Sequence, residues 1–387
     1  MHILFIAPLY FPSVGGAETH TRGIARALAA EHRVTVLTDA GHRGLPRVET
    51  VDGVQVLRTT GAALMPSGAP DEVHWEHGLF GLLAQCENLL RELPQRPDII
   101  HAQCQVAFLL GSILKERLRC PLIATPHETE PEADGLGDAR SRFLCTLPQI
   151  DLFVAGGEVF AQQIRRFGRP GARVEVVASG VFLPEATGVR PPRPHGVPSL
   201  LCVGRFKPRK NQLALLEALA LLRDRGMETH CAFVGSCDAG SMAYRDELVR
   251  RVDDLQSVAA VYEDVPDTEL ASLMRGADLV VQPALAEGLG LVAVEALGMG
   301  TPVVVTPTDG AHEVLAGCRS LMADGFEAHH LADAIATALS YPADYERDLS
   351  RAERVIREKF DARANAARLL RVYQRVLEGE QCGQAAV

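Results

Sequence analysis

Short hydrophobic runs alternate with amphipathic segments along most of the chain. At the N-terminus, a hydrophobic run at residues 3–7 precedes a segment at 17–30 with helical spacing, and a second run follows at 33–38. This order predicts a strand, a crossover helix and a parallel strand. The turn before the helix contains Gly15 and Gly16, at the edge where ligands bind in open α/β sheets. Its spacing is not the GxGxxG of dinucleotide-binding proteins, which argues against an oxidoreductase.

The same pattern continues through the first half of the chain. Residues 47–60 are predicted to form two strands joined by a turn at Asp52-Gly53, a pair typical of tight hairpins. A strand predicted at 121–125 ends shortly before His127, so we expect this histidine at the ligand-binding edge of the sheet. We also expect strands at 98–101, 151–155 and 174–178, and helices at 74–93 and 106–118.

A stretch rich in proline and glycine at 184–199 is the clearest change of composition, and we place an interdomain linker at 186–198. A second α/β series follows, so we predict an N-terminal domain at 1–185 and a C-terminal domain at 199–360. The remaining tail is predicted to be helical. The strands expected in the second series lie at 199–203, 230–234, 258–262, 278–282 and 302–306.

A segment with two carboxylates and two glycines lies before the last of these strands. It runs from Glu287 through Gly288 and Gly290 to Glu295, and is predicted to form a loop, a short helix and a glycine stop. The N–H groups at a helix start near Gly290 would suit an anion such as a phosphate. Glu295 falls on an otherwise hydrophobic helix, where ligand hydroxyls are natural partners for a carboxylate that burial would penalise. A core helix with a half-exposed glutamate remains the alternative.

Two cations follow the first strand of the second series. Arg205 and Lys210 lie between that strand and a helix predicted at 212–224, for which Asn211 is the expected N-cap. Cations beside a helix N-terminus favour a phosphate group. A solvated basic loop is the alternative interpretation.

Composition narrows the classes of partner. The chain has 387 residues and a formal net charge of −10, which argues against nucleic acid and against stable association with an anionic membrane. Nine scattered cysteines without a CxxC pair indicate reduced thiols, and we expect a cytoplasmic protein. An acidic segment after His127 either is solvated or attracts a cationic substrate; it contains Glu128, Glu130, Glu132, Asp134 and Asp138.

The order of these motifs along the chain is more specific than any one of them. The glycine pair, His127, the two cations and the Glu287–Glu295 segment followed by Thr301-Pro302-Val303 resemble retaining glycosyltransferases of the GT-B fold, specifically glycosyltransferase family 4. The resemblance covers nearly the whole chain. It implies two Rossmann-like, doubly wound α/β domains facing each other across a cleft. It also implies that a last helix, at about 361–380, packs back on the N-terminal domain.

The resemblance further implies a role for each motif. Arg205 and Lys210 would grip the donor diphosphate, and Glu295 would hold the ribose. The implied catalytic residues are His127, Arg205, Lys210 and Glu287. The implied donor contacts are Gly15, Gly16, Arg205, Lys210, Tyr262, Val265, Glu287, Gly288, Leu289, Gly290, Leu291 and Glu295. The implied acceptor contacts are Glu18, His127, Glu128 and Glu130.

The chain departs from the family pattern at Ala284, Leu289 and Asp309-Gly310, and it has no DxD motif, so no metal and no other cofactor is expected. We expect a UDP-sugar donor, with UDP-N-acetylglucosamine or UDP-glucose favoured. The expected acceptor is small, polar and amine-bearing, such as an aminocyclitol in antibiotic or other secondary-metabolite biosynthesis. The alternatives are a nucleotide-sugar 2-epimerase, or transfer to a cell-surface polysaccharide or a phosphorylated inositol. The oligomeric state is left open.

Overall fold

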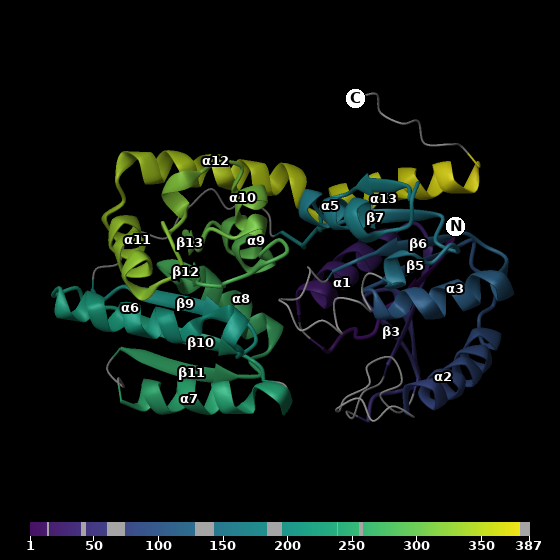
Figure 1. Ribbon diagram of the computed structural model, residues 1–387, viewed down its shortest axis with the longest axis horizontal. Helices are drawn as coiled ribbons and strands as arrows, with labels where there is room; N and C mark the ends of the chain where they lie inside the picture. Colours follow the sequence, from purple (N-terminus) through teal and green to yellow (C-terminus); the bar gives the residue numbers. More distant parts are fainter. Residues whose placement is uncertain are drawn as a thin grey trace. The chain divides into compact units, whose positions relative to one another are not determined.

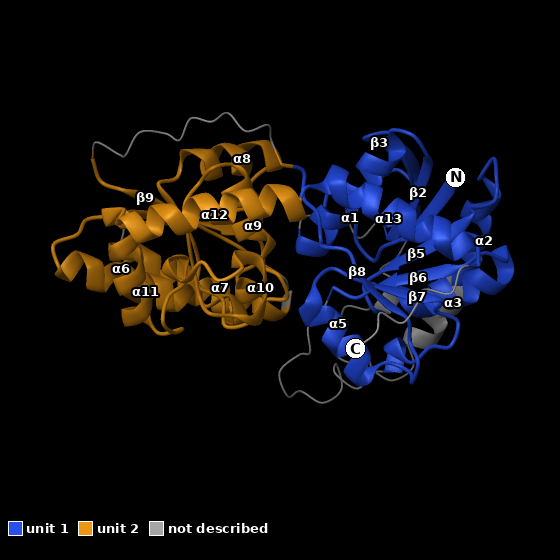
Figure 2. Cartoon of the chain, turned by 90° about the horizontal axis from the view of Figure 1, so that it is seen from above, with its two compact units in different colours: residues 1–182, 361–387 blue, residues 183–360 orange. Residues whose placement is uncertain are grey.

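The computed structural model describes residues 1–13, 15–39, 44–59, 74–127, 143–183, 196–237, 239–254 and 258–379. Most of its helices and strands are labelled in Figure 1. The chain forms two compact units: Met1–Phe182 together with Asp361–Val387, and Leu183–Phe360 (Figure 2). Most of the linker predicted at 186–198 lies outside the described residues.

The first unit contains an eight-stranded sheet in the order β3-β4-β2-β1-β5-β6-β7-β8. Every neighbouring pair is parallel except β3 and β4, which form the hairpin predicted around Asp52-Gly53. Both turn residues have positive φ, as a tight two-residue turn requires. The strands are β1 (His2–Ile6), β2 (Arg33–Asp39), β3 (Val48–Val51), β4 (Val54–Thr59), β5 (Ile99–Gln103), β6 (Leu122–Thr125), β7 (Leu152–Ala155) and β8 (Val174–Val176).

The helices of the first unit include the last helix of the chain. Helix α13 packs against α1, and its Leu369 and Tyr373 join the core built on Ile3 and Phe5 of β1. The Asp361 carboxylate caps α13 by accepting hydrogen bonds from two backbone N–H groups of its first turn. The helices are α1 (Gly16–Ala29), α2 (His74–Arg91), α3 (Val106–Leu118), α5 (Glu158–Phe167) and α13 (Ala362–Leu377).

The second unit contains a five-stranded parallel sheet in the order β11-β10-β9-β12-β13. The strands are β9 (Ser199–Val203), β10 (His230–Gly235), β11 (Ala259–Glu263), β12 (Leu279–Gln282) and β13 (Val303–Val305). The helices are α6 (Gln212–Asp224), α7 (Met242–Asp253), α8 (Asp267–Gly276), α9 (Leu291–Gly298), α10 (Asp309–Leu315), α11 (Ala328–Ser340) and α12 (Ala343–Lys359). Short 3₁₀ turns are η1 (Pro208–Lys210), η2 (Ala239–Ser241) and η3 (Arg319–Leu321).

In each unit, strands are added first on one side of the unit's first strand and then on the other side. The chain moves from β1 to β2 on one side and then crosses to β5 on the other, and β9 lies in the same way between β10 and β12. These strand orders confirm the predicted α/β class with two Rossmann-like units. The carboxyl ends of the strands at such a switch point are where ligands bind in doubly wound sheets.

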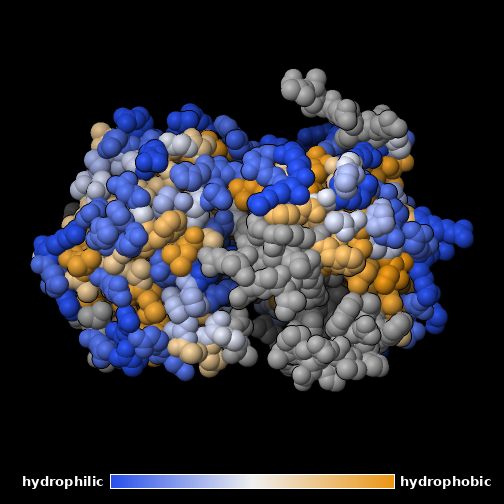
Figure 3. All heavy atoms as spheres, in the orientation of Figure 1, coloured by the Kyte–Doolittle hydropathy of each residue, from blue (hydrophilic) through white to orange (hydrophobic). Residues whose placement is uncertain are grey.

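The described part of the chain combines a mixed surface with free cysteines. Within the described residues, no helix combines the length and the hydrophobicity needed to cross a bilayer. Eight cysteines are described and all are free thiols, six of them buried. On the face shown in Figure 3, the described residues are mainly hydrophilic with hydrophobic ones interspersed, as is normal for a protein surface.

Candidate active site

The loop after β9 is held by backbone contacts that leave Arg205 exposed. Phe206 is fully buried and its N–H donates to the Ser236 carbonyl at 2.9 Å, while the Gln212 amide donates to the Arg205 carbonyl at 3.0 Å. Gly235 has no room for a Cβ atom, because the Gly204 carbonyl occupies that position. The backbone of the loop is therefore fixed, and the Arg205 guanidinium projects from it into solvent.

Lys210 and Glu287 form an ion pair between the Lys210 ammonium and the Glu287 carboxylate. Both side chains are mostly buried, at 16% and 11% exposed, so water screens the pair weakly. Nearby, the Leu285 N–H donates to the Arg209 carbonyl at 2.9 Å. The structure thus brings together the cation motif and the carboxylate motif, which are 77 residues apart in the sequence.

Asn211 does not cap α6 in the way the sequence suggested. It occupies the N-cap position, but its φ of 56° is left-handed and its side chain makes no capping hydrogen bond. Instead, its amide Nδ2 donates to the Phe326 carbonyl at 3.0 Å. The side chain anchors the segment ahead of α11, because the left-handed backbone, which asparagine tolerates, directs it away from the first turn of α6.

Glycine is needed at two positions, one in the loop between β12 and α9 and one in α10, which packs against that loop. Gly290 is the N-cap of α9 with a φ of 71°, and a Cβ atom there would lie 3.0 Å from the Gln282 amide. Gly310, in the first turn of α10, donates its N–H to the Glu287 carbonyl at 3.3 Å, and a Cβ atom there would lie 2.7 Å from Gly288. The pair Asp309-Gly310 therefore lets α10 pack directly on the loop that carries Glu287.

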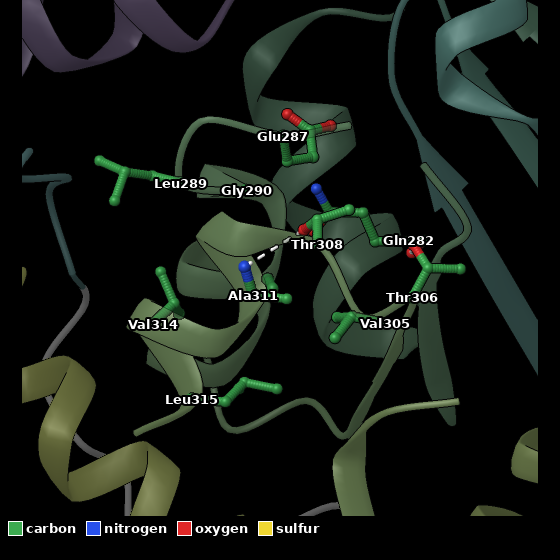
Figure 4. A pocket seen from close by; sticks show the side chains of 11 residues that line it. Gln282, Glu287, Leu289, Gly290, Val305, Thr306, Thr308, Ala311, Val314 and Leu315 are labelled. Atoms are coloured by element: carbon green, nitrogen blue, oxygen red, sulfur yellow. Dashed lines mark hydrogen bonds between the residues drawn. The ribbon is translucent and has the colours of Figure 1, made fainter. Parts of the chain in front are cut away.

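A small pocket lies at the carboxyl ends of β12 and β13, between α9 and α10 (Figure 4). Gln282, Glu287, Thr306 and Thr308 are its polar lining residues, and Leu289 is one of the hydrophobic ones. The Thr308 hydroxyl accepts a hydrogen bond from the N–H of Ala311, drawn as a dashed line in Figure 4, and so caps α10. The pocket combines a few polar groups with a hydrophobic wall, but it is much smaller than the usual binding site for a small molecule.

Glu295 is a half-buried carboxylate on α9. Burial raises its pKa from its ordinary 4.5 to about 7, and the nearby negative charge of Asp267 adds to the effect. Among the described residues, no side chain or N–H donates a hydrogen bond to it. This carboxylate can therefore accept hydrogen bonds from ligand hydroxyls, and such bonds would favour its charged form.

Tyr262 and Val265, the residues predicted beside the nucleotide base, lie at the end of β11 and just beyond it. Tyr262 is 48% exposed and Val265 is half-buried. Between them, Asp264 has a left-handed φ of 52° and donates its N–H to the Gly235 carbonyl at 3.0 Å. The turn after β11 is therefore tied to the turn after β10, at the same edge of the sheet as the loop after β9.

The first unit contains the remaining predicted residues. Gly15 precedes α1 and Gly16 begins it, and the Glu18 carboxylate lies where a Cβ atom on Gly15 would point. The Glu18 side chain would have to turn aside to accept a larger residue at position 15. His127 follows β6. Two other predicted acceptor residues, Glu128 and Glu130, lie outside the described residues.

His127 is part of a buried cluster of neutral side chains. Its Nε2 lies 2.6 Å from Oε1 of Gln103, and its ring centroid lies 5.2 Å from that of His20. The two nitrogens of His101 contact the Tyr373 hydroxyl at 2.6 Å and the Thr125 hydroxyl at 2.7 Å. Burial lowers the pKa of His20 to about 4, that of His101 to about 3, and that of His127 well below its ordinary value.

These rings do not form a metal site. Within the described residues, no group of three or more histidine, cysteine or acidic side chains is arranged to hold an ion. The cluster instead offers hydrogen-bond donors and acceptors without net charge.

Two residues that the sequence reasoning missed take part in these sites, and a third, Gly310, was noted only as a departure from the family pattern. Gln103 and Gln282 each end a buried strand, β5 and β12, at its carboxyl end, and Gly310 packs against the Glu287 loop. A polar residue closing a hydrophobic strand was a usable signal for the two glutamines. The packing role of Gly310 could not be inferred from its place in the motif, because it depends on the contact of one helix with a distant loop.

Two family models cover most of the chain. Residues 15–180 match the model "Glycosyl transferase 4-like domain", and residues 189–355 match "Glycosyl transferases group 1". The chain belongs to the group 1 glycosyltransferases. This confirms the family that the order of the motifs predicted.

Two relatives of the chain are also named as glycosyltransferases. The chain is 28% identical to a D-inositol 3-phosphate glycosyltransferase from an Arthrobacter species, covering 94% of this chain and 91% of the relative. It is 29% identical to another protein of that name from Streptosporangium roseum, covering 93% and 88%.

Solved structures agree on the fold. Sucrose-phosphate synthase from Thermosynechococcus elongatus superimposes with a TM-score of 0.79 at 19% identity, covering 98% of this chain and all of that one. HepE from Anabaena, in a complex with UDP-glucose, superimposes with a TM-score of 0.75 at 20% identity, covering 97% and 99%. The glycosyltransferase therefore has the GT-B fold.

Proposed function

We propose that this glycosyltransferase transfers a hexose or an N-acetylhexosamine from a UDP-sugar to a small polar acceptor, with retention of anomeric configuration. The observation that carries the proposal is the pairing of Lys210 with Glu287 next to the start of α9. It joins, at one sheet edge, a cation suited to a diphosphate and a carboxylate suited to sugar hydroxyls. UDP-N-acetylglucosamine and UDP-glucose are the donors to test first.

The cations would act on the leaving group. Negative charge builds on the departing diphosphate as the glycosidic bond breaks, and groups already in place stabilise that charge without reorganising. Arg205 is exposed and, within the described residues, no carboxylate pairs with it, so its guanidinium is available to a phosphate. Lys210 would supply the second charge, and the N–H groups of residues 289–291 would add backbone donors. No metal is required in this scheme.

The carboxylates would bind the rest of the donor. Glu287 would accept hydrogen bonds from hydroxyls of the transferred sugar, and Glu295 would accept them from the ribose. The raised pKa of Glu295 fits such a role, because hydroxyl donors would replace the water that burial removes.

We assign no protein nucleophile to the reaction. The acceptor oxygen would form its bond to the anomeric carbon on the face from which the diphosphate leaves. The bond between that carbon and the phosphate oxygen breaks, and the same phosphate oxygen takes the proton of the acceptor hydroxyl. This sequence keeps the anomeric configuration and balances the charge with one proton transfer.

The acceptor has two candidates. The acidic segment after His127 favours an amine-bearing polyol such as an aminocyclitol, because negative charge steers a cation. The relatives named D-inositol 3-phosphate glycosyltransferase favour a phosphorylated inositol. Both are small cyclic polyols, so the experiment must separate them by charge.

The test is a UDP-release assay over a panel of UDP-sugars. Each donor is combined with an aminocyclitol, with neutral inositol, with inositol 3-phosphate, and with no acceptor. Acceptor-dependent UDP release with one of these polyols supports the proposal and identifies the acceptor class. Conversion of UDP-N-acetylglucosamine to its 2-epimer without an acceptor would instead indicate an epimerase and refute transfer.

A further inference from the structure

Gln103 and His127 lie side by side at the carboxyl edge of the first unit's sheet. Gln103 is the last residue of β5 and is only 1% exposed, and His127 follows β6 by two residues. The strands are paired in parallel, with Gln103 opposite Thr125. The residue after Gln103, Cys104, has a left-handed φ of 68° and donates its N–H to the Thr125 carbonyl at 2.9 Å. The backbone on both sides of the pair is therefore held firmly.

The contact between the two side chains determines where the imidazole proton lies. Oε1 of Gln103 is 2.6 Å from Nε2 of His127. In this orientation the carboxamide presents its oxygen, which only accepts hydrogen bonds, so Nε2 donates and carries a proton. A neutral imidazole has one N–H, which leaves Nδ1 of His127 with a lone pair.

The surroundings keep the ring in its neutral form. His20 on α1 faces it, and Nδ1 of His20 accepts a hydrogen bond from the Gly180 N–H at 3.1 Å, so that nitrogen carries no proton. His101 on β5 is bonded to two hydroxyl groups. The nearest rings thus bring no negative charge that would stabilise an imidazolium, and burial disfavours one.

We propose that Gln103 is a positioning residue that holds His127 as the Nε2–H tautomer and so presents Nδ1 as a hydrogen-bond acceptor to a substrate hydroxyl. In this arrangement His127 selects a group that can donate a hydrogen bond. It gives no charge to a phosphate and has no Nδ1 proton to offer one. The inference rests on the proposed function for the identity of the hydroxyl, but the tautomer is a property of the protein alone.

The direct test is ¹⁵N NMR of the imidazole rings in the full chain at neutral pH, without substrate. His127→Asn identifies the His127 signals. We expect Nε2 to show the chemical shift of a protonated nitrogen and Nδ1 that of a bare one. A bare Nε2, or a doubly protonated ring at neutral pH, overturns the proposal.

Variants of Gln103 separate positioning from packing. Gln103→Leu keeps the volume but removes the acceptor, so His127 should become a mixture of tautomers. Gln103→Glu keeps the acceptor, should preserve the Nε2–H tautomer, and should raise the pKa of His127 through its negative charge. Gln55→Leu, on β4, is the matched control and should leave the His127 signals unchanged. An unchanged tautomer in Gln103→Leu would count against the proposal.

The kinetic readout follows once a donor and an acceptor are known. Loss of an oriented hydrogen bond should lower kcat/KM of Gln103→Leu about tenfold, and Gln103→Glu should recover most of it above the pKa of its His127. If the leucine variant does not fold, the wild-type spectrum and the glutamate variant still decide the question. Failure of every UDP-sugar would refute the proposed function and leave the NMR result standing, so the two failures are distinguishable.

Discussion

The two units share a strand order at their switch points but place different chemistry there. At the carboxyl edge of the second unit the side chains are charged, with Lys210 paired to Glu287 and Arg205 exposed. At the same edge of the first unit, Gln103 and His127 form a neutral hydrogen-bonded pair. A shared fold therefore does not dictate a shared site. The charged edge suits a diphosphate, whereas the neutral edge suits hydroxyl groups.

The largest effect should come from removing a cation at the charged edge. Lys210→Met should lower kcat by about a hundredfold to a thousandfold, because one preorganised stabiliser of the leaving group is lost. Arg223→Ala, at an exposed position on α6, is the matched control for loss of positive charge and should retain full activity. Steady-state kinetics of UDP release measure both. Wild-type kcat in Lys210→Met would remove the basis for the charged site.

A smaller effect should follow from disturbing the backbone of the loop that carries Glu287. Gly310→Ala places a methyl group 2.7 Å from Gly288 and should push α10 away from the Glu287 loop. We expect a loss of about 1–3 kcal/mol in the free energy of unfolding, with a higher KM for the donor. Urea denaturation and donor kinetics measure these two effects.

Gly276→Ala provides the control for that substitution. Gly276 ends α8, and a Cβ atom there would meet no other atom within 4 Å. This variant should be neutral or slightly more stable, since alanine reduces the freedom of the unfolded chain. Equal stability of the Gly310 and Gly276 variants would show that the α10 contact is unimportant.

A third prediction concerns pH. Because the pKa of Glu295 is raised to about 7 in the folded protein, the folded state keeps a proton that the unfolded chain releases above its ordinary pKa of 4.5. Stability should therefore fall as pH rises from about 4.5 to about 7 and then level off. Glu295→Gln should be more stable than wild type at about pH 8, by about 1–2 kcal/mol after allowing for partial exposure.

Thermal unfolding at several pH values tests this, and the advantage of Glu295→Gln should vanish near the lower end of that pH range. The same variant should bind the donor more weakly, because an amide cannot accept as strongly as a carboxylate. A pH-independent difference in stability would show that Glu295 does not titrate near neutrality.

The smallest effect on catalysis should come from the buried histidine cluster of the first unit. Tyr373→Phe removes the hydroxyl that contacts Nδ1 of His101 at 2.6 Å in the core of the first unit. We expect a loss of about 1–2 kcal/mol in the free energy of unfolding, with an unchanged KM for the donor. Denaturation and donor kinetics measured side by side check this. A changed KM for the donor would show that neutral residues of the first unit also affect donor binding.

Much of the fold could be predicted from the sequence because the relevant signals are local. The helix expected at 106–118 is observed as Val106–Leu118, and that expected at 212–224 as Gln212–Asp224. The break near residues 360–361 separates α12 from α13. Hydrophobic spacing, glycine turns and strand ends specify such elements without reference to distant residues.

The capping role of Asn211 could not be settled in the same way. Its residue type favours a cap, but the left-handed backbone sends its side chain to Phe326 instead. The local rule failed because the backbone conformation, which depends on the tertiary structure, turns the side chain away from the first turn of α6. The small pocket beneath Glu287 was also invisible to pattern reasoning, since four separate segments line it.

The sequence by itself determined the family, the two α/β series and the residues available for chemistry, because these depend on residue type and order. The tertiary structure decided which of those residues meet. The Lys210–Glu287 ion pair and the Gln103–His127 hydrogen bond each join residues at or beyond the carboxyl ends of different strands. Parallel strands bring such ends to one edge only after the sheet forms, so the protonation and pairing of these side chains are properties of the folded chain.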